Sequence, residues 1–349
     1  MNKILSQIWP SLVTAFCVSC LVSRLLAYIA VKRGKSAPTR TGGSMPLTGG
    51  IGVFFGFFLG LIVFMFNYRF REWSGLFFFY GSVFLLGVSF LYFLLGLLDD
   101  KFHFTPLQKL FLFFIVAFLN LIFYSCILVS LTNYEERSVI AFGALFMVAL
   151  FFFSNSYNFL DNADGHCASA VLGLTFALFF VPDGVEEWNY AGLVLAFAVL
   201  GFLVWNFPLK PRLYLGDAGS LFLGACVPTL VFFAVYGVYE DYLFLRIFIA
   251  LNLLAFPLYD TCAVMLLRAL RGQNPTIGGQ DHYSHRLMRG GFPLWLVNLI
   301  AFTAAGVLPA IVLKLPYQTV FFGPFIIWAF LLFLDVLAAF LCLKKSGNH

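Results

Sequence analysis

Four polar segments of the sequence carry side chains that suit the binding of a metal ion and of phosphate groups. GLLDDKF holds two adjacent carboxylates and LYLGDAGSLFLG holds one, while NSYNFLDNADGH and DHYSHRL add amides, acids, histidines and an arginine. Their polar residues are Asp99, Asp100, Asn155, Asn158, Asp161, Asp164, Asp217, His282, His285 and Arg286. Mg²⁺ prefers carboxylate and amide oxygens, and cationic side chains bind phosphate oxygens. The segments together predict a site for a metal ion and a phosphorylated substrate.

Helix geometry separates the roles of these residues. Neighbouring helical residues point about 100° apart, so Asp99 and Asp100 cannot aim at one atom, and we expect one to react while the other positions. A straight helix would turn Asp164 about 180° away from Asn155, so we expect the helix to break near residues 161–165. If the last segment is helical, its histidines and arginine share a face and form a cationic cluster.

A simpler interpretation exists for each acid taken singly. Asp99 and Asp100 can end a helix, and Asp217 can cap the N-terminus of the next helix. Four separate segments with chemically related residues weigh against this interpretation, because all of them follow or precede apolar runs on one side of the predicted topology.

The composition excludes an ordinary soluble domain. Of 349 residues, 62% are hydrophobic and 11% charged, and the mean hydropathy is +0.94. Runs of about 20 apolar residues are long enough to cross a bilayer. They predict an all-α, polytopic transmembrane bundle with one domain over residues 1–349. The expected spans are 10–31, 49–67, 76–98, 106–131, 138–154, 166–182, 189–207, 218–238, 243–267, 294–314 and 317–343.

Loop charge predicts the orientation. An odd number of spans places the termini on opposite faces, and fourteen Lys and Arg residues fall on one face against six on the other. The positive-inside rule makes the first face cytoplasmic, with a periplasmic N-terminus and a cytoplasmic C-terminus in a bacterial inner membrane. The polar segments all lie on the cytoplasmic face. The predicted active-site loops are about 32–48, 99–109, 155–166, 208–220 and 268–293.

At these residues the sequence resembles the polyprenyl-phosphate N-acetylhexosamine-1-phosphate transferase superfamily (glycosyltransferase family 4). The strings that carry the resemblance are PLTGGIGVF (46–54), GLLDDKF (96–102), NSYNFLDNADG (155–165), GDAGSLFLG (216–224) and DHYSHRL (281–287). They extend over nearly the whole chain in the order found in the family, each at the cytoplasmic end of a predicted span.

The resemblance implies an activity and its partners. It implies Mg²⁺-dependent transfer of N-acetylhexosamine 1-phosphate from a UDP-sugar to undecaprenyl phosphate, with release of UMP, as the first step of a lipid-linked cell-envelope glycan such as O-antigen. Mn²⁺ is an alternative ion. Membrane lipids are the surrounding partners, nucleic acid is not expected, and the sequence leaves a homodimer open.

The resemblance also implies roles for individual residues. Asp99 and Asp100 match paired aspartates that engage or deprotonate the lipid phosphate, and Asp161 lies near the catalytic centre. Asn158 and Asp217 match the magnesium ligands. The expected substrate-binding residues are Lys109, Asn155, Asp164, His282, His285 and Arg286.

The sequence departs from the family pattern in two places. His166 stands where an apolar residue usually follows DG, which puts the packing beside the nucleotide in doubt. The third histidine of the family's triple-histidine version is missing, because this chain has the spaced form His-x-x-His-Arg.

The spaced form bears on the sugar. It resembles the branch that uses simple sugars, so UDP-N-acetylglucosamine is the expected donor, and short loops offer little surface for a pentapeptide. Phospho-N-acetylmuramoyl-pentapeptide transferase is the alternative enzyme. A lipid-linked sugar transporter or flippase is the alternative class, but only Arg24, Asp260 and Asp335 fall as charges away from the ends of predicted spans.

The orientation gives a first prediction. A reporter protein that works only in the cytoplasm should be active when it is fused after His349, because the positive charges concentrate on that face. Activity of a reporter that works only in the periplasm would contradict the orientation.

Overall fold

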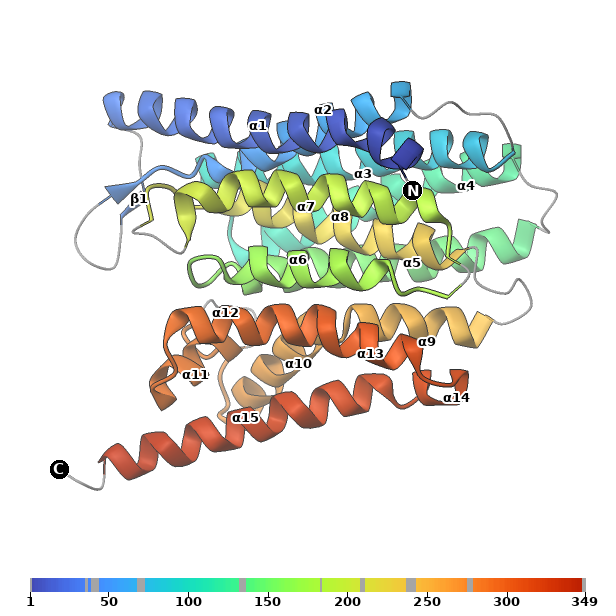
Figure 1. The fold of residues 1–349 in the computed structure, drawn as a ribbon. Helices are drawn as coiled ribbons and strands as arrows, with labels where there is room; N and C mark the ends of the chain where they lie inside the picture. Colours follow the sequence, from blue (N-terminus) through green and yellow to red (C-terminus); the bar gives the residue numbers. More distant parts are fainter. Residues whose placement is uncertain are drawn as a thin grey trace.

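The computed structural model describes residues 2–34, 37–38, 44–67, 73–131, 136–182, 184–207, 211–236, 243–274 and 279–346. Nearly all of them are helical (Figure 1). The first group of elements is α1 (Asn2–Lys32), β1 (Ala37–Pro38), β2 (Ser44–Met45), α2 (Gly49–Asn67), α3 (Trp73–Phe102), α4 (Pro106–Leu131), α5 (Glu136–Leu160), α6 (His166–Leu178), α7 (Glu186–Asn206) and α8 (Gly216–Tyr236). The second is α9 (Leu243–Leu253), α10 (Ala255–Leu270), α11 (Tyr283–Gly290), α12 (Leu294–Phe302), the π-helical turn η1 (Thr303–Val307), α13 (Leu308–Lys314), α14 (Tyr317–Val320) and α15 (Gly323–Ser346).

Each of the eleven predicted spans overlaps helix, but residues 179–182 of the sixth follow the end of α6, residues 237–238 of the eighth lie outside the described residues, and the ninth and eleventh are each divided between two helices. Within the described residues, eight helices are long and apolar enough to cross a membrane, and α9 with α10 forms one further bent candidate. The stretches 106–122 of α4 and 166–178 of α6 are apolar but shorter. The all-α, multi-pass membrane fold is confirmed, whereas the count of eleven and the orientation stay predictions. Residues 35–36, 39–43, 208–210 and 275–278 of the predicted active-site loops lie outside the described residues.

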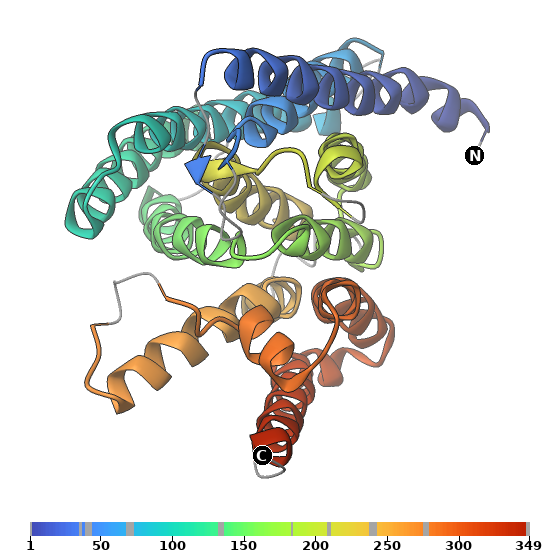
Figure 2. The same cartoon turned by 90° about the vertical axis from the view of Figure 1, so that its left-hand side faces the viewer.

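The helices form two groups that lie side by side (Figures 1 and 2). In the first group α8 is central and packs against α3, α5 and α2, and 94% of its apolar window is buried. The second group, from α9 to α15, contacts the first through α5, α6 and α8. The N- and C-termini lie toward opposite ends of the helices, and α11 lies at the end that holds the C-terminus (Figure 1).

Glycines let α2, α3 and α8 approach closely at the end where α8 begins. A Cβ atom at Gly50 would lie 2.2 Å from the Gly219 nitrogen, and one at Gly96 would lie 2.3 Å from the Asp217 carbonyl oxygen. The Gly50 nitrogen donates to the Leu215 carbonyl at 2.8 Å. These contacts bring the starts of α2 and α8 against the end of α3, so three of the sequence motifs meet there.

A bend of 72° separates α9 from α10, which the sequence did not predict. Pro257 stands in the first turn of α10, where its ring nitrogen has no hydrogen to donate to the carbonyl four residues earlier, so the helix is interrupted near Leu253. Asn252 donates to the Val320 carbonyl at 2.8 Å and ties the bend to α14. The bend turns α10 away from the helix direction of α9, and α10 projects from the bundle in Figure 2.

The contact at Gly96 gives a second prediction. Gly96→Ala should lower both the melting temperature and turnover, because the new methyl group would meet the backbone of Asp217 and Ala218 and must push α8 away from α3. The measurement is thermal unfolding with activity in the same detergent. Leu98→Ala on the same helix is the control, since Leu98 is 45% exposed. An unchanged Gly96→Ala protein would contradict the close packing.

Candidate active site

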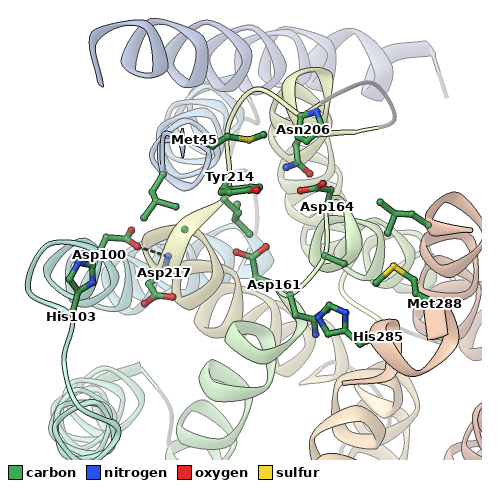
Figure 3. A pocket seen from close by; sticks show the side chains of 17 residues that line it. Met45, Asp100, His103, Asp161, Asp164, Asn206, Tyr214, Asp217, His285 and Met288 are labelled. Atoms are coloured by element: carbon green, nitrogen blue, oxygen red, sulfur yellow. Dashed lines mark hydrogen bonds between the residues drawn. The ribbon is translucent and has the colours of Figure 1, made fainter. Parts of the chain in front are cut away.

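Carboxylates from three parts of the chain surround a cavity of about 740 Å³ at the start of α8 (Figure 3). Asp100 comes from the end of α3 and Asp217 from the first turn of α8, and Asp161 and Asp164 come from the loop after α5. In Figure 3, His285 lies across the cavity from Asp100. The acids that the sequence places in separate motifs are therefore brought together.

Asp100 holds the N-terminus of α8. Its two carboxylate oxygens accept the backbone N–H groups of Asp217 at 2.9 Å and Ala218 at 3.1 Å. Helix N-terminal N–H groups lack partners within their own helix and attract negative charge. Gly216, with φ of 77°, makes the left-handed turn that starts the helix. Asp100 is thus a helix-capping residue, as the simpler interpretation proposed. The helix that it caps is not its own but α8, and the contact positions Asp217.

Asp99 points elsewhere, as helix geometry predicts. Its Oδ1 accepts the Phe104 N–H at 2.9 Å, and its Oδ2 forms a short ion pair with Lys109. The Lys109 ammonium also lies 3.0 Å from Asp217 Oδ2. Lys109 therefore bridges the carboxylates of α3 and α8.

Asn158 completes this centre from α5. Its Nδ2 donates to Asp217 Oδ1 at 2.8 Å and contacts the Ser220 hydroxyl oxygen at 2.9 Å. The two predicted metal ligands, Asn158 and Asp217, are therefore neighbours. We call Asp99, Lys109, Asn158 and Asp217 the central cluster.

The chain breaks between α5 and α6 as expected. α5 ends at Leu160, and Gly165, with φ of 72°, precedes α6. Two buried amides clamp the intervening loop: Asn206 Oδ1 accepts the Gly165 N–H at 2.7 Å, and Asn298 Nδ2 donates to the Asp164 carbonyl at 2.8 Å. The loop is thereby held so that Asp161 and Asp164 line the cavity.

His166 packs inside the protein behind this loop. It is fully buried, its Nδ1 lies 3.4 Å from Asn298 Oδ1, and its ring meets Phe256 edge-on. The unusual residue therefore contacts the amide that clamps the loop and does not line the cavity. His103, which the sequence led us to expect in solvent, is exposed but lies at the wall of the cavity.

Asp161 has an altered ionisation. Burial, followed by the negative charges of Asp217 and Asp100, raises the pKa of Asp161 to about 8. The carboxyl group is therefore largely protonated at pH 7, and a cation among these carboxylates would lower its pKa.

A second cavity of about 420 Å³ lies on the other side of the central cluster. Lys109, Asn155, Asn158 and His282 line it together with apolar side chains. These are Phe104, Pro106, Leu110, Phe151, Phe152, Phe159 and Met265. The cavity thus combines a polar end with an apolar wall, and we call it the apolar groove.

Asn162 lines both cavities. Ser284, in the DHYSHRL segment, donates a short hydrogen bond from its hydroxyl group to Asn162 Oδ1. The first cavity and the apolar groove therefore adjoin at the central cluster and at Asn162.

The histidines and arginine of DHYSHRL do not form the single cluster that we expected. His282 precedes α11 in extended conformation and lines the apolar groove, whereas His285 lies in the helix and lines the first cavity. The Arg286 guanidinium donates to Asp335 on α15 at 2.9 and 2.8 Å. The spacing argument failed because His282 is not helical and because adjacent residues 285 and 286 point about 100° apart.

The sequence analysis did not predict several residues that take part in the site. They are Asn162, Asn206, Ser284 and Asn298, with Asp260 and Asp335 seen only as charges within spans. A charged side chain inside a membrane span has a high free-energy cost unless it is paired with an opposite charge. The presence of Asp335 in a span was therefore the signal that could have linked it to Arg286. The buried amides gave no comparable signal.

The donor set suits a small divalent cation that also binds substrate. Among the residues that the structure describes, no three His, Cys, Asp or Glu side chains converge on one point. Mg²⁺ commonly takes one or two carboxylates from the protein and its other ligands from water and phosphates. Asp217 fits that pattern through its carboxylate, and Asn158 would fit it through its side-chain amide oxygen, because the Nδ2 group that faces Asp217 cannot bind a cation.

The chain is similar to known glycosyl transferases. A model of glycosyl transferase family 4 matches residues 82–237. The chain is 26% identical over 348 residues to a probable undecaprenyl-phosphate N-acetylglucosaminyl 1-phosphate transferase of Bacillus subtilis, covering 97% of this chain and 92% of the relative. It is 26% identical over 320 residues to an undecaprenyl-phosphate alpha-N-acetylglucosaminyl 1-phosphate transferase of Escherichia coli O157:H7, covering 87% and 81%.

An archaeal protein is also similar. A putative UDP-N-acetylglucosamine–dolichyl-phosphate N-acetylglucosaminephosphotransferase of Sulfolobus acidocaldarius is 28% identical over 234 residues, covering 63% of this chain and 69% of the relative. The helical membrane fold and these relatives together indicate a membrane-embedded transferase. The family match and these relatives support the assignment of the chain to the polyprenyl-phosphate N-acetylhexosamine-1-phosphate transferase superfamily.

The different contacts of the paired aspartates give a third prediction. Asp100→Asn should lower the melting temperature and turnover together, because the new amide NH₂ would face a backbone N–H and at least one hydrogen bond, about 1 kcal/mol, is lost. Asp99→Asn should chiefly raise the Michaelis constant of the phosphate acceptor by freeing Lys109. Thermal unfolding and steady-state kinetics measure both, and equal mild losses in the two variants would contradict these roles.

Proposed function

We propose that the protein transfers N-acetylglucosamine 1-phosphate from UDP-N-acetylglucosamine to undecaprenyl phosphate at the cytoplasmic face of the inner membrane, with Mg²⁺ and with release of UMP. The observation that carries the proposal is the meeting of two unlike cavities at the central cluster. One is large and bordered by acids and a histidine, and the other has an apolar wall. A water-soluble nucleotide and a lipid phosphate require this combination.

The first cavity is the proposed site of the UDP-sugar. Its volume of about 740 Å³ falls in the range of small-molecule sites, and Asp161, Asp164 and His285 offer hydrogen bonds to the nucleotide and sugar. The apolar groove receives the lipid phosphate, whose charge faces Lys109 while the first isoprene units contact Phe151 and Phe152.

Mg²⁺ would be held by Asp217 and Asn158 and would supply charge neutralisation across the pyrophosphate. Mn²⁺ is the alternative ion. In that arrangement the Lys109 ammonium, now between Asp99 and Asp217, contacts phosphate oxygens, and Asp99 keeps it in the groove. Asp100 holds Asp217 in place through α8.

A single displacement accounts for the reaction. An oxygen of the lipid phosphate attacks the β-phosphorus, the bond from that phosphorus to the bridging oxygen breaks, and the electron pair leaves with UMP. A phosphate is an adequate nucleophile, so no aspartyl intermediate is needed. The product is a lipid-linked sugar that begins a cell-envelope glycan such as O-antigen.

The sugar is proposed from two observations. The relatives in Bacillus subtilis and Escherichia coli carry names that specify N-acetylglucosaminyl 1-phosphate transfer. The DHYSHRL segment keeps the spaced histidines and places His285 in the first cavity. Both favour a simple N-acetylhexosamine over a muramoyl-pentapeptide.

The fourth prediction tests the activity. Purified protein with Mg²⁺, undecaprenyl phosphate and a panel of UDP-sugars should release UMP with UDP-N-acetylglucosamine, and Asp217→Asn should abolish release without lowering the melting temperature by more than a few degrees. Glu186→Gln is the control, because Glu186 is exposed in the first turn of α7. Turnover only with the muramoyl-pentapeptide donor would overturn the proposed sugar, and a normal Asp217→Asn enzyme would overturn the metal site.

A further inference from the structure

A buried acid–imidazole pair lies behind the apolar groove. Asp260 on α10 and His282 before α11 are 1% and 3% exposed. Asp260 Oδ2 lies 3.1 Å from His282 Nδ1, and Asp260 Oδ1 accepts the Tyr283 N–H at 2.6 Å. Both oxygens of this intramembrane carboxylate are therefore directed at the first residues of the DHYSHRL segment.

The imidazole of His282 faces the groove. It lines that cavity with Lys109 and Asn158, and its ring packs against Phe159 with centroids 5.3 Å apart. Within the described part of the chain, Asp260 is its hydrogen-bonding partner, through Nδ1. Nε2 is then the ring nitrogen that remains for a ligand in the groove.

We propose that His282 accepts the proton of the lipid phosphate and that Asp260 is a positioning residue that fixes the His282 tautomer. A carboxylate that accepts Nδ1–H leaves the lone pair on Nε2, which is the form that a general base requires. This inference rests on the proposed function, since it concerns the phosphate that would occupy the groove.

The proton transfer prepares the nucleophile. A phosphate monoester keeps one proton on part of its population near its second pKa of about 6, and that form is the weaker nucleophile. The P–O–H proton moves to Nε2 and its electron pair stays on the oxygen, which then attacks the β-phosphorus while UMP departs with the electron pair of the broken bond. The imidazolium, stabilised by Asp260, returns its proton to water after the products leave.

Asp99 is less suited to this role. Its Oδ1 accepts the Phe104 N–H and its Oδ2 pairs with Lys109, so both oxygens are engaged. Asp99 thus holds the Lys109 ammonium, and the deprotonation that the resemblance gave to the paired aspartates is assigned to His282.

Other titratable groups surround His282 and bear on any pH measurement. They are Asp260 and Arg268 on α10, Asp281, Arg286, His166 on α6, and Lys109 across the groove. These side chains are present in both the wild type and the His282 variant. The ratio of wild-type to variant rates at each pH therefore isolates the imidazole better than either profile alone.

The first test changes the imidazole. His282→Gln keeps a hydrogen-bonding group near the Nε2 position but cannot carry the proton. At pH 5, where only about a tenth of a phosphate monoester with a second pKa of about 6 is already ionised, it should lower kcat/KM for undecaprenyl phosphate about 30-fold. At pH 8.5 the deficit should shrink to about threefold, because the phosphate arrives already ionised. An equal deficit at both pH values would overturn the proton-acceptor role.

The second test changes the positioning residue. Asp260→Asn keeps an oxygen for the Tyr283 N–H but presents an NH₂ group to Nδ1, so His282 would hold its proton on Nε2. We expect a loss similar to that of His282→Gln, and no more than about threefold further loss in the double variant. Asp100→Asn is the control, because Asp100 acts through the N-terminus of α8 and its loss should multiply with that of His282→Gln.

A direct readout keeps the inference separate from the activity. Nitrogen-15 NMR of histidine-labelled protein, assigned with His282→Gln, should show Nδ1–H in the wild type and Nε2–H in Asp260→Asn. The positioning role would be overturned if the losses of Asp260→Asn and His282→Gln multiplied in the double variant. It would also be overturned if the wild type and Asp260→Asn showed the same His282 tautomer. Failure of the wild-type protein to release UMP would instead overturn the proposed function.

Discussion

The structure depends on giving the carboxylates within and at the ends of its apolar helices a compensating partner. An ionised side chain near a bilayer is costly unless a partner compensates for lost water. Asp100 is compensated by the N-terminus of α8, Asp99 by Lys109, and Asp335 by Arg286. Each pair joins helices distant in sequence, so the same interactions that stabilise the acids also fix the arrangement of the bundle.

The close packing of α2, α3 and α8 serves this constraint. Asp100 can reach the first N–H groups of α8 only because Gly96 and Gly50 let the backbones approach. The close packing at Gly50 and Gly96 is thereby coupled to the orientation of Asp217. A change in side-chain volume several ångströms from the cavity should be felt at the site, because the helix end cannot move independently of its cap.

Sequence reasoning reached the membrane fold and most of the wall of the site. Apolar runs of span length and a break at Gly165 are local properties, so they could be predicted from periodicity and from glycine. The bend before Pro257 was missed because the apolar run continues through it and hides the interruption. The separation of His285 from His282 and Arg286, which both lie near Asp260, was missed because it depends on where α11 begins and on partners in α10 and α15.

The clamps around the DNADG loop could not be found in the same way. Asn206 and Asn298 stand in apolar runs where an amide has no fixed meaning, and only the fold reveals that both contact residues 164 and 165. Asp260 gave a partial signal as an acid within a span, but its histidine partner lies 22 residues away in sequence. Long-range pairing is the information that a single sequence lacks.

The long separation between Asp100 and its partner has a consequence for biosynthesis. Asp100 and the Asp217 N–H are 117 residues apart, and Lys109 and Asp217 are 108 apart. At about 5 to 20 residues per second, the ribosome needs several seconds or more to supply α8 after α3 has been made. During that interval Asp99 and Lys109, only ten positions apart, are able to neutralise each other in the nascent chain. The centre would then be completed when α8 enters the membrane and its first amides reach Asp100.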